Sequence, residues 1–354
     1  MDTIRPPRFS FRIGSLGLGL IFAAIFGIAL FLAIADIGFA RIWDEVTSVG
    51  IGLVGIIAVH IGQLAFCAFA WSVLFASVEP SRRPGLLDVF TLRWIRESID
   101  HLLPVAQVGG EIAAGRLLAA ERMSLPAAGA SIIADLTIET LTQALFTLIG
   151  LGLIFALADP GDVGRWAGLG FGLALLLGVL VVFAQRWGGV RLFEKLLLTI
   201  ADKMGWNKLE GIAGLDQALA RIYQLRRKLL LAGVHHMAAW ALGAGEVMIG
   251  AWALGYPIGL GEALVIESLA QAIRSVAFFV PGALGVQEGG FVVLAALFGI
   301  PSDVALSLSL TKRIRELAIG LPGLAAWQLQ ELRLRRARRA VGHGRAMEMD
   351  RKAV

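Results

Sequence analysis

The sequence contains few charged residues for its length. Asp, Glu, Lys and Arg make up 17% of the 354 residues and hydrophobic residues make up 57%, with a mean hydropathy of +0.75. A soluble domain carries about 25% charged residues, so this composition excludes an ordinary soluble globular protein. It predicts an all-α membrane protein, because a helix satisfies its backbone hydrogen bonds within its own segment even in lipid.

Cysteine, nucleotide-binding loops and metal-binding motifs are also scarce. The single Cys67 excludes an intramolecular disulfide. No Gly-rich nucleotide loop occurs outside the apolar segments, which argues against ATP hydrolysis. His235, His236 and Glu246 invite a metal or proton-relay hypothesis, but no HExxH motif or cysteine cluster accompanies them. We therefore expect no metal and no cofactor, and favour a hydrogen-bonded histidine pair packed in the bundle.

Six stretches are long and apolar enough to cross a bilayer, which takes roughly 20 residues of helix. They are Ser15 to Ala35, Val49 to Val78, Leu125 to Leu157, Trp166 to Ala184, Leu229 to Leu254 and Asp303 to Gln328. The first follows three arginines and resembles a cleavable signal. Its apolar core is longer than that of a signal peptide, so we interpret it as an uncleaved anchor.

Lysine and arginine are unevenly distributed between the connecting segments. Four segments are rich in them, namely 1–14, 79–96, 186–228 and 331–354, whereas 36–48 and 159–165 are poor. The positive-inside rule places the rich segments, and both termini, in the cytoplasm. Segment 186–228 also carries leucine stripes, which predicts amphipathic helices on the cytoplasmic interface. With the basic tail it would favour anionic lipid, or act only as a topology determinant.

Two further segments, 85–124 and 258–302, are each long enough for two helices. The first arm of 85–124 contains Asp88, Arg93, Arg96, Glu97 and Asp100. A lipid-facing helix does not tolerate so many charges, but a helix surrounded by protein or by a water-filled cavity does. We therefore predict that each segment is a re-entrant helical hairpin.

The two hairpins share a pattern at an offset of 177 residues. Proline precedes glutamate by seven positions in both, as Pro104 and Glu111 and as Pro281 and Glu288. The same offset pairs Ser98 with Ser275 and Glu139 with Glu316. The expected turn residues are Pro104, Gly109, Gly110, Pro281, Gly282 and Gly285.

This pattern predicts two repeats, 15–157 and 158–330, each made of two crossings, a hairpin and a third crossing. Three crossings are an odd number, so the second repeat enters the membrane inverted relative to the first. In such folds the broken helices meet near the midplane of the bilayer.

Charged residues on these elements are the candidates for a transport cavity: Glu111, Glu288, Arg274, Arg96, Asp135, Glu139, Arg313 and Glu316. Glu111 and Glu288 lie near helix starts, where they either cap their own helix or line a polar cavity as ion-pair partners or proton carriers. The arginines could bind an anionic headgroup or neutralise nearby acids.

The acids of the two third crossings must be paired if they are buried in the membrane. In one reading the pairs are structural, with Glu316 on Lys312 and Asp135 on an arginine of the first hairpin. In the other reading the pairs also rearrange during transport.

The hairpin motifs resemble those of a known membrane-protein family. LLPVAQVGGE, and FVPGALGVQEGG followed by TKRIRELAIGLPGLAAWQ, resemble the family named after the transmembrane region of lysylphosphatidylglycerol synthase, over about residues 15–330. The ending RELAIGLPGLAAWQ is similar to the branch associated with bacterial hopanoid biosynthesis. Members are flippase-like. Synthases of the family carry a large soluble catalytic domain, whereas here a short tail follows Gln328, so we expect no enzyme activity.

The resemblance implies a lipid transporter of the bacterial inner membrane that moves a hopanoid or a related amphiphile. Expected partners are that lipid, anionic lipid at the basic surface, and lipid-biosynthetic enzymes; we expect no nucleic acid. Two alternatives are a scaffold for biosynthetic enzymes and an intramembrane enzyme acting on a lipid headgroup, with Glu111, Asp135 or a histidine as acid or base.

Overall fold

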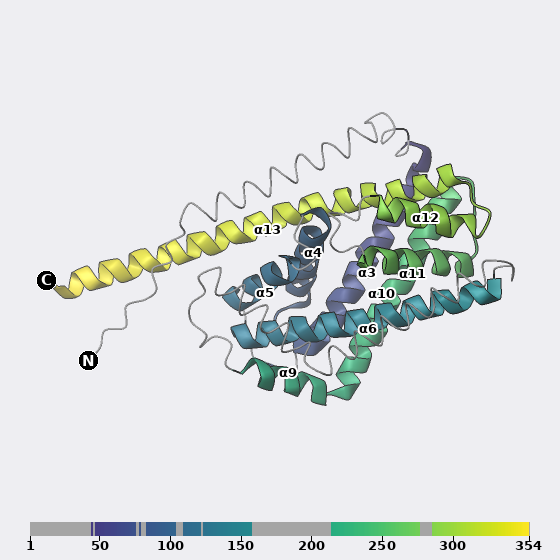
Figure 1. Ribbon diagram of the computed structural model, residues 1–354. Coiled ribbons are helices and arrows are strands. Elements are labelled where there is room, and N and C mark those ends of the chain that lie inside the picture. The colour runs from purple at the N-terminus through teal and green to yellow at the C-terminus, as the bar shows by residue number, and fades with distance from the viewer. Residues whose placement is uncertain are drawn as a thin grey trace.

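The computed structural model (Figure 1) describes residues 44, 47–75, 78, 83–103, 109–121, 123–157, 214–276 and 285–353. Within these residues the regular secondary structure is helix, as expected for an all-α protein. Several predictions lie outside the described residues: the crossings at 15–35 and 166–184, most of segment 186–228, and Pro104, Pro281 and Gly282.

The described helices follow the same order twice. In the first half, the long helix α3 (Ile51–Phe75) is followed by two short helices, α4 (Leu86–Leu102) and α5 (Gly109–Glu121), and then by a second long helix, α6 (Leu125–Leu157). After the short α9 (Leu215–Gln224) come α10 (Arg226–Ala253), α11 (Leu260–Val276), α12 (Val286–Ala296) and α13 (Ser302–Ala353). Each of the two predicted hairpins is thus a pair of short helices.

Two of the long helices, α3 and α6, are long and apolar enough to cross a membrane. The bounds of α6 are those expected from the sequence, and α10 begins three residues earlier than expected. α13 passes beyond Gln328 to Ala353, so the basic tail continues the helix. The residues after Gln328 are mostly Glu, Leu, Arg and Ala, which are good helix formers and give the helix no reason to stop.

The four short helices, α4, α5, α11 and α12, contain 17, 13, 17 and 11 residues. At about 1.5 Å per residue they measure roughly 17 to 25 Å, less than the hydrocarbon core of about 30 Å. α4 packs on α5, and α11 packs on α12.

A glycine lies at or just before the start of the second helix of each pair. The Gly110 N–H donates to Asp100 Oδ1 at 2.8 Å, and a Cβ at Gly110 would overlap the Arg96 carbonyl, so α5 meets α4 at close range. Gly285 precedes α12 with φ +78° and donates its N–H to Glu288 Oε2 at 2.7 Å. Gly109 and Gly110 belong to the first turn of α5 itself.

The long helices connect the two halves crosswise. α3 packs along α10, α13 packs against α4, and α6 packs against α11. Each short-helix pair therefore lies against a long helix from the other half of the chain. This arrangement brings charged residues that are distant in sequence to the same interfaces.

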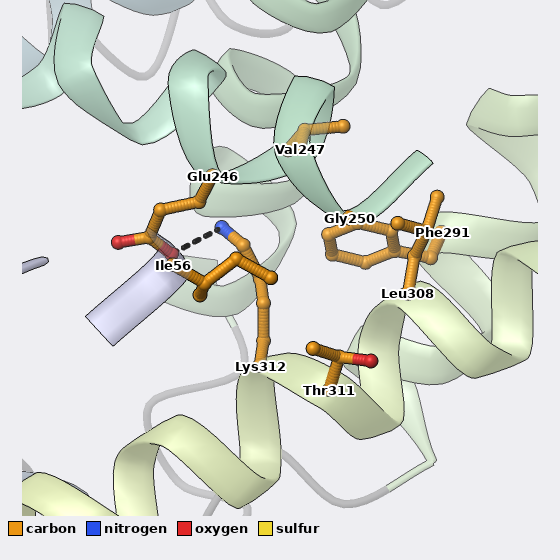
Figure 2. Close-up of a pocket in the computed structure, with 8 residues that line it drawn as sticks. All are labelled: Ile56, Glu246, Val247, Gly250, Phe291, Leu308, Thr311 and Lys312. Atoms are coloured by element: carbon orange, nitrogen blue, oxygen red, sulfur yellow. Dashed lines mark ion pairs between the residues drawn. The ribbon is translucent and has the colours of Figure 1, made fainter. Parts of the chain in front are cut away.

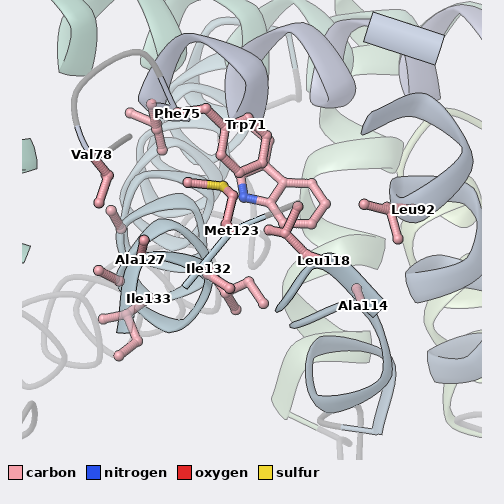
Figure 3. Close-up of a cluster of buried hydrophobic side chains, with 14 of the residues drawn as sticks. Trp71, Phe75, Val78, Leu92, Ala114, Leu118, Met123, Ala127, Ile132 and Ile133 are labelled. Atoms are coloured by element: carbon pink, nitrogen blue, oxygen red, sulfur yellow. The ribbon is translucent and has the colours of Figure 1, made fainter. Parts of the chain in front are cut away.

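Apolar side chains fill the space around these interfaces. Figure 3 shows one cluster, in which Trp71 and Phe75 of α3 meet Leu118 of α5 and Ile132 of α6. A second cluster surrounds Phe291 of α12. The apolar residues of α9 also belong to the first cluster, because Leu215, Ala218, Leu219 and Ile222 are buried there. The apolar face of α9 thus packs on α6.

The contact of α13 with α4 depends on Gly323. A Cβ at Gly323 would lie 2.8 Å from Ser98 Cβ and 2.9 Å from Trp94 Nε1. We predict that Gly323→Leu lowers the free energy of unfolding by about 1 to 3 kcal/mol through overpacking. The measurement is thermal unfolding in detergent, with Gly152→Leu as control, since nothing lies within 4 Å of a Cβ at Gly152. Equal stability of the two variants would contradict this packing.

Candidate functional site

The first buried network consists of Arg93, Arg96, Glu111, Asp135, Glu139 and His236. Arg93 and Arg96 are three residues apart on α4, and Asp135 and Glu139 are four apart on α6, so each pair shares a helix face. Because α5 lies between α4 and α6 in the chain and contacts both, it adds Glu111. The network thus joins the three helices of the first half that follow α3.

Arg96 is the centre of this network. Its Nε donates to Glu111 at 2.8 Å, Nη1 to Asp135 at 2.6 Å and Nη2 to Glu139 at 2.9 Å. Arg93 donates both terminal nitrogens to the two oxygens of Glu139. Only arginine offers donors in a fixed planar fork that serves three carboxylates at once. Arg96 is 3% exposed and Asp135 is fully buried, so the charges depend on one another for solvation.

The second half of the chain contributes His236 to the first network. Its Nε2 lies 3.0 Å from Asp135 Oδ1, and the ring is fully buried. His235, the next residue, points elsewhere, with ring contacts to Phe66 and Phe69. The predicted hydrogen-bonded pair of His235 and His236 is therefore wrong. Neighbouring positions on a helix point about 100° apart, so they face different helices.

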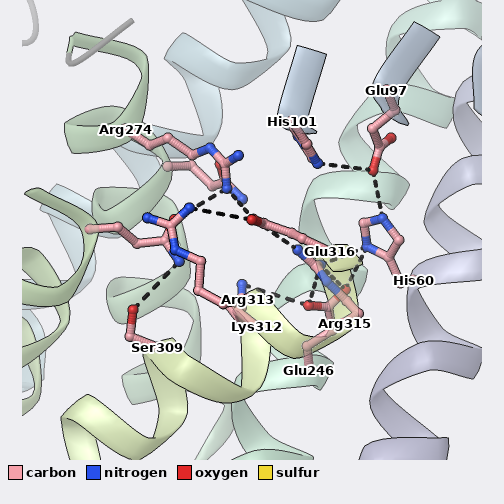
Figure 4. Close-up of polar contacts among 12 residues, drawn as sticks. His60, Glu97, His101, Glu246, Arg274, Ser309, Lys312, Arg313, Arg315 and Glu316 are labelled. Atoms are coloured by element: carbon pink, nitrogen blue, oxygen red, sulfur yellow. Dashed lines mark hydrogen bonds and ion pairs between the residues drawn. The ribbon is translucent and has the colours of Figure 1, made fainter. Parts of the chain in front are cut away.

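The second buried network is larger (Figure 4). It consists of His60, Glu97, His101, Glu246, Glu267, Arg274, Glu288, Lys312, Arg313, Arg315 and Glu316. Five of these residues are carboxylates, and four are lysine or arginine. They come from both halves of the chain, with α13 supplying three of the four cations and α3 and α4 supplying both histidines.

Glu246 of α10 holds the inner end of this network. Arg315 Nη1 donates to its two oxygens at 2.9 and 2.6 Å, Gln63 donates to it, and Lys312 Nζ lies 3.7 Å away. Lys312 also donates to Glu267 of α11. The Glu267 side chain lies over Gly243 of α10, where a Cβ would come within 2.7 Å of its oxygen. The small residue at position 243 therefore leaves room for Glu267 of α11 to reach Lys312.

The outer end of the second network is less buried. Arg274 of α11 donates to Glu316 and to Gln287, the latter at 3.2 Å. Arg313 donates to Glu288 at 3.1 Å and to Glu316 at 3.4 Å. Side-chain exposure rises from 3% at Glu316 to 13% at Arg313 and 27% at Glu288. Glu288 therefore has the most exposed side chain of the network.

A small cavity lies beside the inner end of the network (Figure 2). Glu246 and Lys312 meet at its wall, and the lining includes Thr311 and the apolar residues Phe291 and Leu308. Its volume is about 10 Å³, which is room for about one water molecule. This space is therefore far too small for a lipid headgroup in this conformation.

The eight predicted cavity residues are divided between the two networks. Arg96, Glu111, Asp135 and Glu139 belong to the first, and Arg274, Glu288, Arg313 and Glu316 to the second. Asp135 pairs with an arginine of the first hairpin, as one reading expected. Glu316 does not pair with Lys312, because α11 brings Arg274 to Glu316 and Glu267 to Lys312. Glu288 both caps its helix and binds Arg313.

Sequence reasoning missed the central position of His60 and did not consider Glu267 at all. His60 is a titratable residue within an otherwise uncharged span, which marks it as a residue that faces protein instead of lipid. Its partners could not be read from the sequence, since Glu97, Glu246 and Arg315 lie 37, 186 and 255 residues away.

One group of side chains in the described residues has metal-binding atoms close together. Ligand atoms of Cys67, Glu139 and His236 lie within 4.8 Å of one another. However, both oxygens of Glu139 already accept hydrogen bonds from Arg93, and Arg96 binds it as well. A divalent cation there would meet two guanidinium groups at close range in a low-dielectric interior. The two arginines therefore explain the burial of Glu139 at this position better than a metal ion does.

We predict that Arg96→Ala strongly destabilises the protein, because it leaves three buried carboxylates without their shared donor. Removing one partner from a buried ion pair costs about 3 to 5 kcal/mol. Arg96→Lys should restore part of this loss, since a point charge cannot satisfy three acceptors in a plane. Unfolding in detergent measures the effect, with Arg227→Ala, at an exposed position, as control. Equal stability of Arg96→Ala and the control would refute the role of Arg96.

The comparison with protein families agrees with this membrane architecture. The family model described as lysylphosphatidylglycerol synthase TM region matches residues 16–323. No curated protein and no solved structure matches the chain. The match includes every member of both buried networks. With two helices apolar enough to cross a bilayer, the chain is a membrane protein and belongs to the family of the lysylphosphatidylglycerol synthase transmembrane region.

Proposed function

We propose that this protein is a lipid transporter of the bacterial inner membrane that moves a polar-headed amphiphile across or out of a leaflet. The observation that carries the proposal is the pair of buried ion-pair networks at the junctions of short helices. Charges inside a membrane protein are costly, face the bundle interior and mark ion or substrate pathways. The resemblance of RELAIGLPGLAAWQ to the hopanoid-associated branch makes a hopanoid the first cargo to test.

The arrangement of the helices supports an inverted repeat of six crossings and two re-entrant hairpins. The order of long and short helices recurs, and the contact of α4 with α13 has its counterpart in the contact of α11 with α6. A two-fold axis in the membrane plane would exchange these contacts and leave the central pair, α3 and α10, in place. Such symmetry provides two alternative openings of one site. Cytoplasmic termini complete this proposed topology.

The outer edge of the second network is the proposed headgroup site. Arg274 and Arg313 are fork-shaped donors that suit a phosphate or carboxylate, and Glu288 is an acceptor for an ammonium or hydroxyl group. In the described conformation Arg313 binds Glu288, and both arginines bind Glu316. A headgroup would therefore replace their mutual ion pairs, so that the charges remain paired while the lipid is bound.

A scaffold for lipid-biosynthetic enzymes is the second candidate function. The observation that favours it is α13, whose C-terminal part projects well past the short helices α4 and α5 (Figure 1). The basic sequence of this part would suit an acidic partner or an anionic membrane surface.

We predict that the purified protein in liposomes speeds the transbilayer movement of its lipid, with hopanoid and a phospholipid as the two cargoes. Arg274→Ala and Glu288→Gln should each slow the movement at least tenfold, since each removes a charged partner of the headgroup worth about 1.5 to 3 kcal/mol. Arg227→Ala is the matched control. Mass spectrometry of the recovered lipid should show it chemically unchanged, which separates transport from enzyme activity.

Unaltered movement in both folded variants would contradict the headgroup site. No movement of either lipid by the wild-type protein would contradict transport. If truncation after Glu331 abolishes function in cells while Arg274→Ala has no effect there, the scaffold explains the protein better.

A further inference from the structure

We propose that His60 is a proton-binding site and that its protonation rearranges the ion pairs of the second network. The inference rests on the proposed function, for which it identifies the proton as the coupling ion. It is carried by the hydrogen-bond geometry of the ring, by the charges of the network and by the helices that the ring connects.

Both ring nitrogens of His60 face carboxylates. Nε2 lies 2.6 Å from Glu97 Oε1, and Nδ1 lies 2.9 Å from Glu246 Oε1. Arg315 Nη1 also approaches Nδ1, at 2.7 Å. The ring is 6% exposed, so water does not replace these partners.

A neutral ring and a charged ring satisfy these contacts differently. A neutral imidazole has one N–H, so Nε2 donates to Glu97 and Nδ1 accepts from Arg315. In that state the Nδ1 lone pair faces the Glu246 oxygen without a proton between them. A protonated ring donates to both carboxylates, and Arg315 can then no longer donate to Nδ1. One proton therefore decides whether Arg315 is bonded to His60 or to the carboxylates alone.

The charges around the ring favour an added proton. α4 contributes Glu97 and His101, α10 contributes Glu246, and α13 contributes Lys312, Arg315 and Glu316. α6 also packs on α3, but its acids are bound by the arginines of the first network. Five carboxylates face four lysine and arginine residues in the whole network. A proton on His60 makes these charges equal, and unequal charge is costly in a low-dielectric interior.

Two partly exposed residues of α4 lie on the Glu97 side of the ring. His101 is 24% exposed and lies 3.8 Å from Glu97 Oε1, and Glu97 is 17% exposed and contacts His60. The first gap is too long for a hydrogen bond, and one water molecule would bridge it. These residues of α4 would therefore be the route by which the ring exchanges protons.

The position of His60 connects the proton to the transport site. His60 lies on α3, Glu97 on α4 of the first hairpin, Glu246 on α10 and Arg315 on α13. Arg315 also approaches Glu316 at 3.5 Å, and Glu316 is the partner of Arg274 at the outer edge. A change in the bonds of Arg315 therefore reaches the proposed headgroup site through one carboxylate.

Histidine-selective NMR on the full-length protein in detergent tests the inference directly. The chain contains five histidines, and His60→Gln identifies the signal of the ring. We expect that signal to change from its charged to its neutral form as the pH is raised, because one proton converts the ring between these two forms. His235→Gln is the control, because His235 lies on α10 against aromatic rings. It should leave the His60 signal unchanged.

A His60 signal that keeps one protonation state at every pH at which the protein stays folded would overturn the inference. If His60→Gln fails to fold, Glu97→Gln provides the test, since it removes one carboxylate that holds the charged ring. We expect the neutral form of His60 to extend over more of the pH range in Glu97→Gln. An unchanged titration in that variant would also overturn the inference.

Lipid movement in liposomes separates this inference from the proposed function. The wild-type rate should depend on pH, and His60→Gln should be both slower and independent of pH. Identical pH profiles in the two proteins would overturn proton coupling and leave transport intact. Titration of His60 without any lipid movement would overturn transport and leave the proton site intact.

Discussion

The structure depends on the need of every buried charge for a partner. In the membrane interior an unpaired carboxylate or guanidinium costs several kcal/mol, and hydrophobic attraction between helices is weak because lipid is as apolar as leucine. Ion pairs therefore largely determine which helices pack together. Arg96 holds α4 to α5 and α6, and Arg315 holds α13 to α10. A helix that moved without exchanging these partners would leave charges unpaired.

Two helices belong to both networks at once. α4 contributes Arg93 and Arg96 to the first and Glu97 to the second, while α10 contributes His236 to the first and Glu246 to the second. In each network a histidine comes from the opposite half of the chain. The first network also has one more carboxylate than it has arginines. His236 contacts a carboxylate of this network, as His60 contacts carboxylates of the second. The two networks are therefore linked through α4 and α10.

The sequence was informative where a signal is local, and it was uninformative where partners are distant. The bounds of α6, the short helices of both hairpins and the left-handed glycine at position 285 follow from apolar length, charge and turn residues nearby in the chain. Pairing Glu316 with Lys312 was a reasonable local inference, since the two are four residues apart on one helix. It failed because α11 supplies a better-placed partner to each. His60 illustrates the same limit, because an isolated histidine shows that it is buried but not what it contacts.

The size of the small cavity bears on how the proposed transport would proceed. A space of about 10 Å³ beside Glu246 and Lys312 holds about one water, so this cavity is not itself a headgroup chamber. In the proposed transport the headgroup would arrive as a replacement partner, entering where Glu288 and Arg313 are partly exposed and taking over bonds that these residues make to each other. In this mechanism charges are never left bare, and the barrier is set by how easily ion pairs exchange. The proton proposed at His60 would lower that barrier without opening a pore, because it would change the partner of one guanidinium and leave the apolar packing around it in place.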